Sequence, residues 1–184
     1  MLKLRNQLCG LAALLACTAC HDVNPPLTTV AQVDLPRFMG SWYVIANIPT
    51  RIERNAHNAV ETYRLRSDGT IDTTFTFNKS AADGPLKTYR PRGFVLDQGS
   101  NAVWGMQFLW PIKADYRIMY LDADYTQTVV GRTARDYVWI MSRTPQLPEA
   151  AFERLRALVV SQGYDAASLQ RVPQRAANVP VAKP

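Results

Sequence analysis

Residues 58–78 read NAVETYRLRSDGTIDTTFTFN, two runs of alternating apolar and polar residues on either side of Ser67-Asp68-Gly69. Alternation with a period of two predicts β-strands, and a short turn that contains glycine predicts an antiparallel hairpin between them. Four residues of the second run share one face of the expected strand: Ile71, Thr73, Phe75 and Phe77. This stretch therefore predicts an antiparallel sheet with an apolar face that needs burial.

Similar runs precede and follow this hairpin. Strands are expected at 41–48, 58–66, 70–78, 87–96, 102–109, 115–121, 125–131 and 136–142. No helical crossover separates these runs, which favours antiparallel neighbours in a sandwich or an up-and-down barrel.

The period changes in residues 148–163, where Pro148 precedes and Gly163 ends a stretch with apolar residues three and four apart. Those residues are Phe152, Leu155, Leu158 and Val159. This spacing predicts one amphipathic helix, whose apolar face would lie on the outside of the sheet.

The N-terminus has the features of an export signal. Lys3 and Arg5 precede a short apolar stretch that is too short to span a bilayer. Leu14-Leu15-Ala16-Cys17 resembles a bacterial lipobox, so Cys17 is the expected site of acylation, with Cys20 as the second choice. A soluble signal peptide and a redox or zinc-binding Cys-x-x-Cys pair are the alternatives.

These features divide the chain into four parts. We expect a lipoprotein signal peptide at 1–16, a lipidated tether at 17–34, one folded domain at 35–172 and a disordered tail at 173–184. A length of 184 residues fits a single domain.

Composition argues against several classes of function. The net charge falls from +6 to +4 when Lys3 and Arg5 are removed with the signal, and no basic run remains, so nucleic-acid binding is not expected. All three cysteines lie in the first 20 residues, and the chain has only two histidines, His21 and His57. No metal or cofactor site is therefore expected in the domain.

Three segments, in order, resemble the signatures of the lipocalin family. Gly40-Ser41-Trp42-Tyr43 resembles the first signature, and residues 121–125, LDADY, resemble the second. Residues 135–145, RDYVWIMSRTP, resemble the last strand of bacterial outer-membrane lipocalins and the third signature. The resemblance implies an all-β, eight-stranded antiparallel up-and-down barrel with the C-terminal helix on its outside. It also implies that Trp42 fills one end of the barrel and that Arg143 packs across it.

Alternation indicates which side chains enter such a barrel. The expected ligand-binding residues are Phe75, Phe77, Tyr89, Trp104, Met106, Phe108, Tyr116, Ile118 and Trp139. Large aromatic residues are also what fills the interior of a small barrel, so packing is the alternative for each of them. Glu61 has the same parity as Tyr63 and is expected to point inward, where its carboxyl would need a partner or a raised pKa.

The resemblance implies a carrier of fatty acid or lysophospholipid. It would be anchored to the outer membrane through its N-terminal lipid, facing the periplasm and serving membrane maintenance under stress, with a homodimer as one available assembly. The alternatives are an enzyme acting on a small apolar substrate, a haem protein and a structural envelope protein. The isomerase type of lipocalin uses a cysteine inside the barrel, and residues 21–184 contain none. A binding protein that is not an enzyme is therefore expected.

Overall fold

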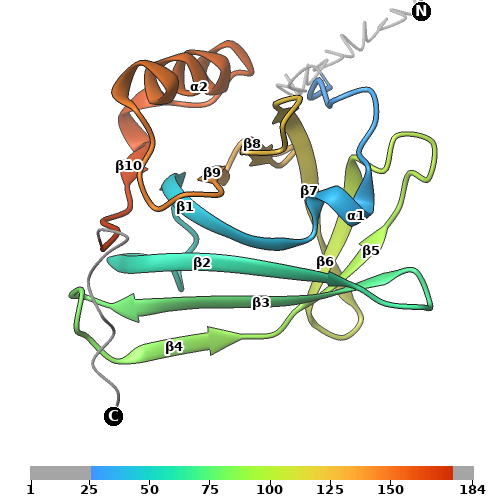
Figure 1. Cartoon of the computed structure of the whole chain (residues 1–184), viewed down its shortest axis with the longest axis horizontal. Coiled ribbons are helices and arrows are strands. Elements are labelled where there is room, and N and C mark those ends of the chain that lie inside the picture. The colour runs from blue at the N-terminus through green and yellow to red at the C-terminus, as the bar shows by residue number, and fades with distance from the viewer. Residues whose placement is uncertain (1–25, 176–184) are drawn as a thin grey trace, which may run out of the picture.

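A closed antiparallel β-barrel forms the body of the protein in the computed structural model, which describes residues 26–175 (Figure 1). The barrel strands are β1 (Gly40–Ile48), β2 (Ala56–Leu65), β3 (Thr70–Lys79), β4 (Leu86–Tyr89), β5 (Arg92–Val95), β6 (Val103–Leu109), β7 (Ile112–Leu121), β8 (Gln127–Gly131) and β9 (Val138–Ser142). The other elements are α1 (Leu35–Phe38), α2 (Glu149–Ser161), a 3-10 turn (Ala166–Ser168) and β10 (Gln170–Arg171).

The strands pair in antiparallel order along the path β1-β2-β3-β5-β6-β7-β8-β9, with β4 paired to β3, and β1 closes the barrel by pairing with both β2 and β9. β4 and β5 together occupy the position of the fourth expected strand, so the barrel has eight strand positions. The short β10 adds to the outer edge of β1. The prediction of an eight-stranded antiparallel barrel with one C-terminal helix is confirmed.

The fourth strand position is interrupted at Arg90-Pro91, because proline has no backbone N–H to donate to a neighbouring strand. β4 pairs with β3 through residues 86–89, and β5 pairs with both β3 and β6. Within residues 26–175, β4 has no second strand partner. The wall of the barrel is therefore not hydrogen-bonded between β4 and the end of β6.

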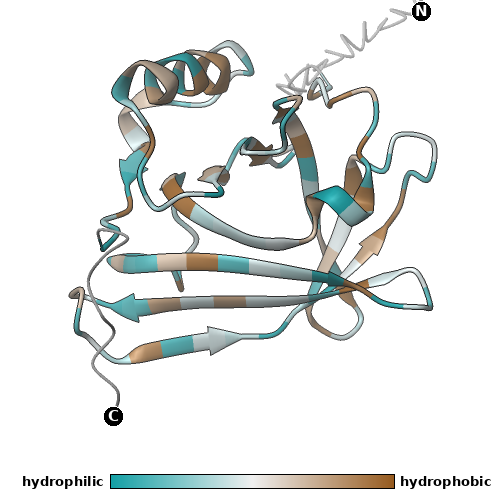
Figure 2. Ribbon diagram, in the orientation of Figure 1, coloured by the Kyte–Doolittle hydropathy of each residue, from teal (hydrophilic) through white to brown (hydrophobic). Residues whose placement is uncertain are grey.

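The alternation of apolar and polar residues separates two apolar clusters. Bands of opposite hydropathy follow one another along β2 and β3 (Figure 2). Inward side chains such as Trp42, Ile71 and Ile118 form the cluster inside the barrel. Outward side chains of β1, β8 and β9 form the second cluster, together with three buried residues of α2: Phe152, Leu155 and Val159. The helix therefore lies on the outside of the barrel, as expected from its spacing.

Described residues on both sides of the expected domain contact the barrel. Leu27 is buried in the cluster beneath α2, and the Val33 N–H donates to the carbonyl of Ser100. At the other end, the Gln174 amide donates to the carbonyls of Val44 and Ala59. Residues 26–34 and 173–175 therefore pack against the barrel, because backbone acceptors there offer them partners. The segment expected to be a signal peptide, Cys17, Cys20 and residues 176–184 lie outside the described residues.

Candidate functional site

The two ends of the barrel differ because α1 covers only one of them. Strand direction places the segments 66–69, 96–102 and 122–126 at the same end as α1. Phe38 of α1 is fully buried there, with its ring 5.1 Å from that of Trp42 and 5.4 Å from that of Trp104. The segments 49–55, 80–85 and 132–137 lie at the opposite end, which we call the open end.

Trp42 and Arg143 lie together at the closed end. The guanidinium carbon of Arg143 is 3.8 Å from the centroid of the Trp42 ring. Its nitrogens donate to the carbonyls of Ser41, Arg37 and Tyr125 at 2.9–3.2 Å, and the indole N–H of Trp42 donates to the carbonyl of Phe38 at 2.9 Å. These contacts tie the last strand to α1 and β1.

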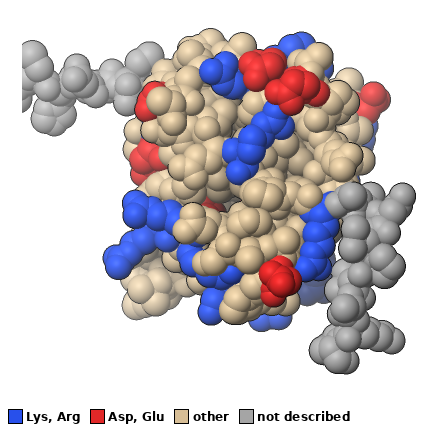
Figure 3. Space-filling view, turned by 90° about the vertical axis from the view of Figure 1, so that its left-hand side faces the viewer, with Lys and Arg blue, Asp and Glu red and all other residues tan. Residues whose placement is uncertain are grey.

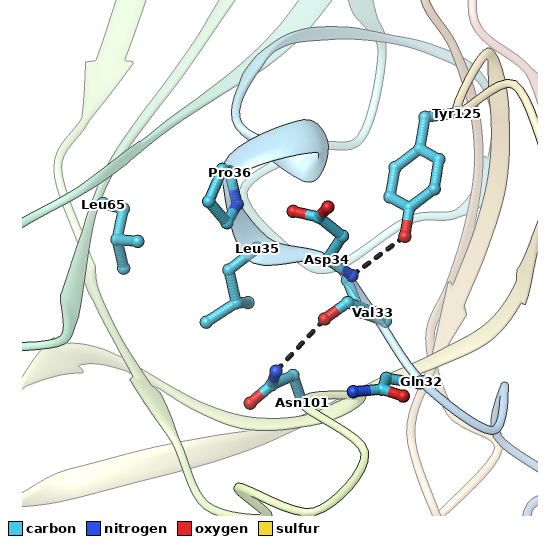
Figure 4. A pocket seen from close by; sticks show the side chains of 8 residues that line it. All are labelled: Gln32, Val33, Asp34, Leu35, Pro36, Leu65, Asn101 and Tyr125. Carbon is cyan, nitrogen blue, oxygen red and sulfur yellow. Dashed lines mark hydrogen bonds between the residues drawn. The ribbon is translucent and has the colours of Figure 1, made fainter.

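A depression of about 590 Å³ lies on this closed end and is shown in Figure 4. Its polar groups already bond to one another: Tyr125 accepts from the Asp34 N–H at 2.8 Å, and Asn101 donates to the Val33 carbonyl at 3.1 Å. It shares no lining residue with the cavity inside the barrel. We therefore treat it as a structural feature of the closed end.

The candidate ligand site is a cavity of about 540 Å³ inside the barrel. Residues from two open-end segments line it, Thr50–Glu53 and Arg132 with Tyr137, so the cavity opens at that end. Figure 3 looks onto the face where β2 begins and β3 ends, and it shows Lys and Arg side chains around a hollow. The size lies within the range of pockets that hold small organic ligands.

Six of the nine residues predicted to bind ligand line this cavity: Phe75, Tyr89, Met106, Phe108, Tyr116 and Trp139. The other three residues of that prediction, Phe77, Trp104 and Ile118, lie elsewhere in the barrel interior. Each is almost completely buried in the inner apolar cluster and does not line the cavity. Trp104 also donates its indole N–H to the Asn101 carbonyl at 2.7 Å, which holds it at the closed end. Parity places these side chains inside the barrel, but it does not distinguish filled from open interior.

Several lining residues come from loops, where no periodicity exists to predict them. Arg51 and Arg132 place cationic groups on the cavity wall, and Glu53 places an acidic one there. Arg132 donates from Nη1 to Asp136 at 3.0 Å, while its buried Nε–H has no acceptor. A buried donor without a partner is costly, so Arg132 is held on the cavity wall at a cost in free energy.

Glu53 is a buried carboxylate with donors around it. It accepts from the backbone N–H of Thr50 at 2.9 Å, from the indole of Trp139 at 3.2 Å and from the amide of Asn47 at 3.3 Å. Burial raises the pKa of Glu53, and these hydrogen bonds act in the opposite direction. Glu53 thereby fixes the loop after β1 and the Trp139 ring that faces the ligand space.

Glu61 also lines the cavity, on the inward face of β2. Its carboxyl is hydrogen-bonded to Tyr63, whose hydroxyl is 2.6 Å from that of Tyr116. Burial raises the pKa of Glu61 to about 7, and the negative charge of Glu53 adds to this effect. Burial also raises the pKa of both phenols, which therefore stay protonated at neutral pH. The structure thus brings Glu53, a loop residue that strand alternation does not reveal, to the same cavity as Glu61, whose inward direction alternation predicts.

The β6–β7 hairpin extends the apolar lining of the cavity to the outer surface. Phe108 lines the cavity and is 55% exposed, and Trp110 at the tip is 81% exposed. Leu109 and Ile112 are exposed beside them. A contiguous exposed group of large apolar side chains is unusual on a soluble surface and marks a place of contact with apolar material.

Comparison of the sequence with known proteins identifies the family. The profile of the lipocalin-like domain matches residues 33–174. Temperature-induced lipocalin-1 of Arabidopsis thaliana is 31% identical, with 80% of this chain and 83% of the relative covered. The outer membrane lipoprotein Blc of Escherichia coli K12 is 30% identical, with 80% and 84% covered.

Solved structures show the same fold at low sequence identity. Insecticyanin from the tobacco hornworm superposes with a TM-score of 0.63 at 15% identity, over 80% of this chain and 84% of its own. Lobster apocrustacyanin A1 superposes with a TM-score of 0.60 at 16% identity, over 78% and 81%. In the described part of this chain, no helix is long and apolar enough to cross a membrane.

Proposed function

The chain belongs to the lipocalin family, and from that premise we propose that it binds fatty acid or lysophospholipid as a carrier, without catalysing a reaction. The observation that carries the proposal is the cavity of about 540 Å³ with aromatic and aliphatic walls. An alkyl chain inside it gains about 0.8 kcal/mol for each buried methylene group, less the cost of ordering the chain.

The polar groups of the open end support a ligand with an anionic head. Arg51 and Arg132 come from open-end loops, whereas Phe75 and Met106 lie on strands inside the barrel. The chain of the lipid would lie along these strands, and its carboxylate or phosphate would lie near the guanidinium groups of Arg51 and Arg132.

The relatives support a position at the outer membrane, because the Blc proteins that resemble this chain are outer membrane lipoproteins. We propose that this chain is acylated at Cys17, with Cys20 as the second choice, and that the barrel faces the periplasm. The exposed Leu109 and Trp110 would then bring the mouth of the cavity to a lipid surface, from which a ligand could enter.

Binding is favoured over acid–base catalysis by the state of the carboxyl groups on the cavity wall. The oxygens of Glu53 are occupied by the donors of Asn47, Thr50 and Trp139. Asp115 is occupied by Arg117 and Thr133. Glu61 retains hydrogen-bonding capacity, but the phenols of Tyr63 and Tyr116 beside it stay protonated at neutral pH, so they supply no second group that exchanges a proton there.

Ligand titration tests the carrier function. The full chain with Cys17→Ser and Cys20→Ser, which leaves the barrel unchanged, is titrated with palmitate and with lysophosphatidylcholine while tryptophan fluorescence is followed. Ala114→Trp would fill the cavity and should weaken binding at least about tenfold. Ile112→Trp, at the exposed hairpin tip, is the matched control and should bind like the parent. Failure of the parent to bind either lipid would contradict the proposal.

The anchor is tested in cells by separate Cys17→Ser and Cys20→Ser replacements. We expect Cys17→Ser to release the protein from the membrane fraction and Cys20→Ser to leave it there. Release by Cys20→Ser alone would move the acylation site to Cys20, and retention of both variants would contradict an acyl anchor.

A further inference from the structure

Glu61 stands between apolar side chains on both neighbouring strands. In the barrel register it is opposite Trp42 on β1 and opposite Phe75 on β3. Side chains opposite one another in register point to the same side of a sheet, so all three face inward. Glu61 therefore has no cation beside it on either adjacent strand.

The other titratable and charged groups of the cavity do not neutralise Glu61. Tyr63 and Tyr116 supply a hydrogen bond and no charge, and the negative charge of Glu53 disfavours ionisation. Asp115 is paired with Arg117 at 3.0 Å, and Arg132 is paired with Asp136 at 3.0 Å. The remaining groups on the wall are Arg51, Tyr89 and Tyr137. Within residues 26–175, no Lys, Arg or His lies within salt-bridge distance of Glu61.

Water in the open cavity is the remaining partner for a Glu61 carboxylate, and a lipid chain would displace it. An alkyl chain offers no hydrogen bond in return, so an ionised carboxylate beside it would be buried without compensation. A neutral carboxyl group carries no charge that must be desolvated, so it fits against the chain even though the hydrogen bond from Tyr63 by itself favours the ionised form.

We propose that Glu61 makes lipid binding proton-linked, so that the barrel takes up one proton at this side chain when an alkyl chain fills the cavity and loses affinity as the pH rises. The inference rests on the proposed lipid-binding function. The proton comes from solvent and adds to one carboxylate oxygen, and no other bond changes.

The size of the effect follows from linkage. Glu61 of the empty barrel is largely protonated below a pH of about 7, where binding needs no proton uptake. Above that pH, each further unit raises the Kd by up to about tenfold, as long as the carboxyl stays neutral in the complex. The affinity is therefore highest in mildly acidic solution.

The test uses lysophosphatidylcholine below its critical micelle concentration as the probe, because its head group does not titrate in this range. The full chain with Cys17→Ser and Cys20→Ser is titrated between about pH 6 and pH 9, and Glu61→Gln is added to the same chain. The Kd of the parent should rise steeply above neutral pH, while that of the Gln variant should stay nearly constant. Calorimetry in two buffers of different ionisation enthalpy should show uptake approaching one proton by the parent at the alkaline end.

Asp115→Asn is the matched control, since this residue also lines the cavity but has Arg117 as its partner. It should keep the pH dependence of the parent. A parent whose affinity is constant with pH, or a Glu61→Gln variant that keeps the full dependence, would overturn the inference and leave the carrier function standing. Absence of binding by the parent and the Gln variant even in mildly acidic solution would overturn both.

Discussion

The guanidinium group of Arg143 lies against Trp42 with its carbon 3.8 Å from the ring centroid, while its nitrogens reach backbone carbonyls of three segments. Gly40 makes this approach possible. It has a φ of +91°, and a Cβ there would lie 3.3 Å from Nη1 of Arg143. The arginine therefore closes the barrel through hydrogen bonds to the backbone as well as through its contact with the ring.

Arg143→Lys should destabilise the protein by about 2 kcal/mol, because the donors of an ammonium group share one nitrogen and cannot reach the separate carbonyls that Nε, Nη1 and Nη2 of the planar guanidinium reach. Urea denaturation measures this change. Arg64→Lys is the control, since Arg64 is exposed and pairs with Asp72 on the surface, and it should alter stability by less than about 0.5 kcal/mol. Equal effects of the two replacements would contradict the closing role of Arg143.

Glu61→Gln should change how stability depends on pH. Between pH 4.5 and about 7 the folded protein holds a proton that the unfolded chain has released, so stability falls as the pH rises through this window and stays low above it. The Gln variant lacks this loss, so its free energy of unfolding should exceed that of the wild type by up to about 3 kcal/mol at alkaline pH. Below pH 4.5 the two free energies should differ little.

Denaturation with urea at several pH values measures the difference. Asp115→Asn should behave in the opposite way. Burial alone would raise the pKa of Asp115, but hydrogen bonds from Thr133 and Arg117 outweigh burial and lower it, so its ionised form stabilises the fold at neutral pH. A pH-independent difference between Glu61→Gln and the wild type would show that Glu61 is not the titrating group.

Much of the barrel is predictable because strands repeat with a period of two over long runs. That period alone is enough to assign Glu61, Tyr116 and Trp139 to the inward face, and all three line the cavity. The break at Arg90-Pro91 is harder to place, since a proline indicates an irregularity but not which half of the strand keeps which partner. The packing of residues 26–34 depends on acceptors such as the Ile118 carbonyl. Because these acceptors are distant in sequence, a local pattern of residues does not predict this packing.

Replacement of the exposed Phe108 and of the buried Ile118 should distinguish a residue that contacts ligand from one that packs the barrel interior. Phe108→Ala should weaken lipid binding several-fold with little loss of stability, because its side chain already has solvent on one side. Ile118→Ala leaves a void in the inner cluster and should cost about 2–5 kcal/mol. Fluorescence titration and urea denaturation of both variants measure the two effects, and a Phe108→Ala protein that is as unstable as Ile118→Ala would contradict the division.

Arg132 is one of the residues of the site that strand periodicity could not reveal, because it lies in the loop between β8 and β9. If its guanidinium group binds the head group of a ligand, Arg132→Met should weaken palmitate binding by at least about tenfold, the usual worth of a hydrogen bond to a charged group. The alcohol with the same alkyl chain lacks the negative charge, so its affinity should change little. Arg154→Met on the outer face of α2 is the control and should bind both ligands like the wild type. Equal losses for the acid and the alcohol would mean that Arg132 shapes the cavity and does not recognise the head group.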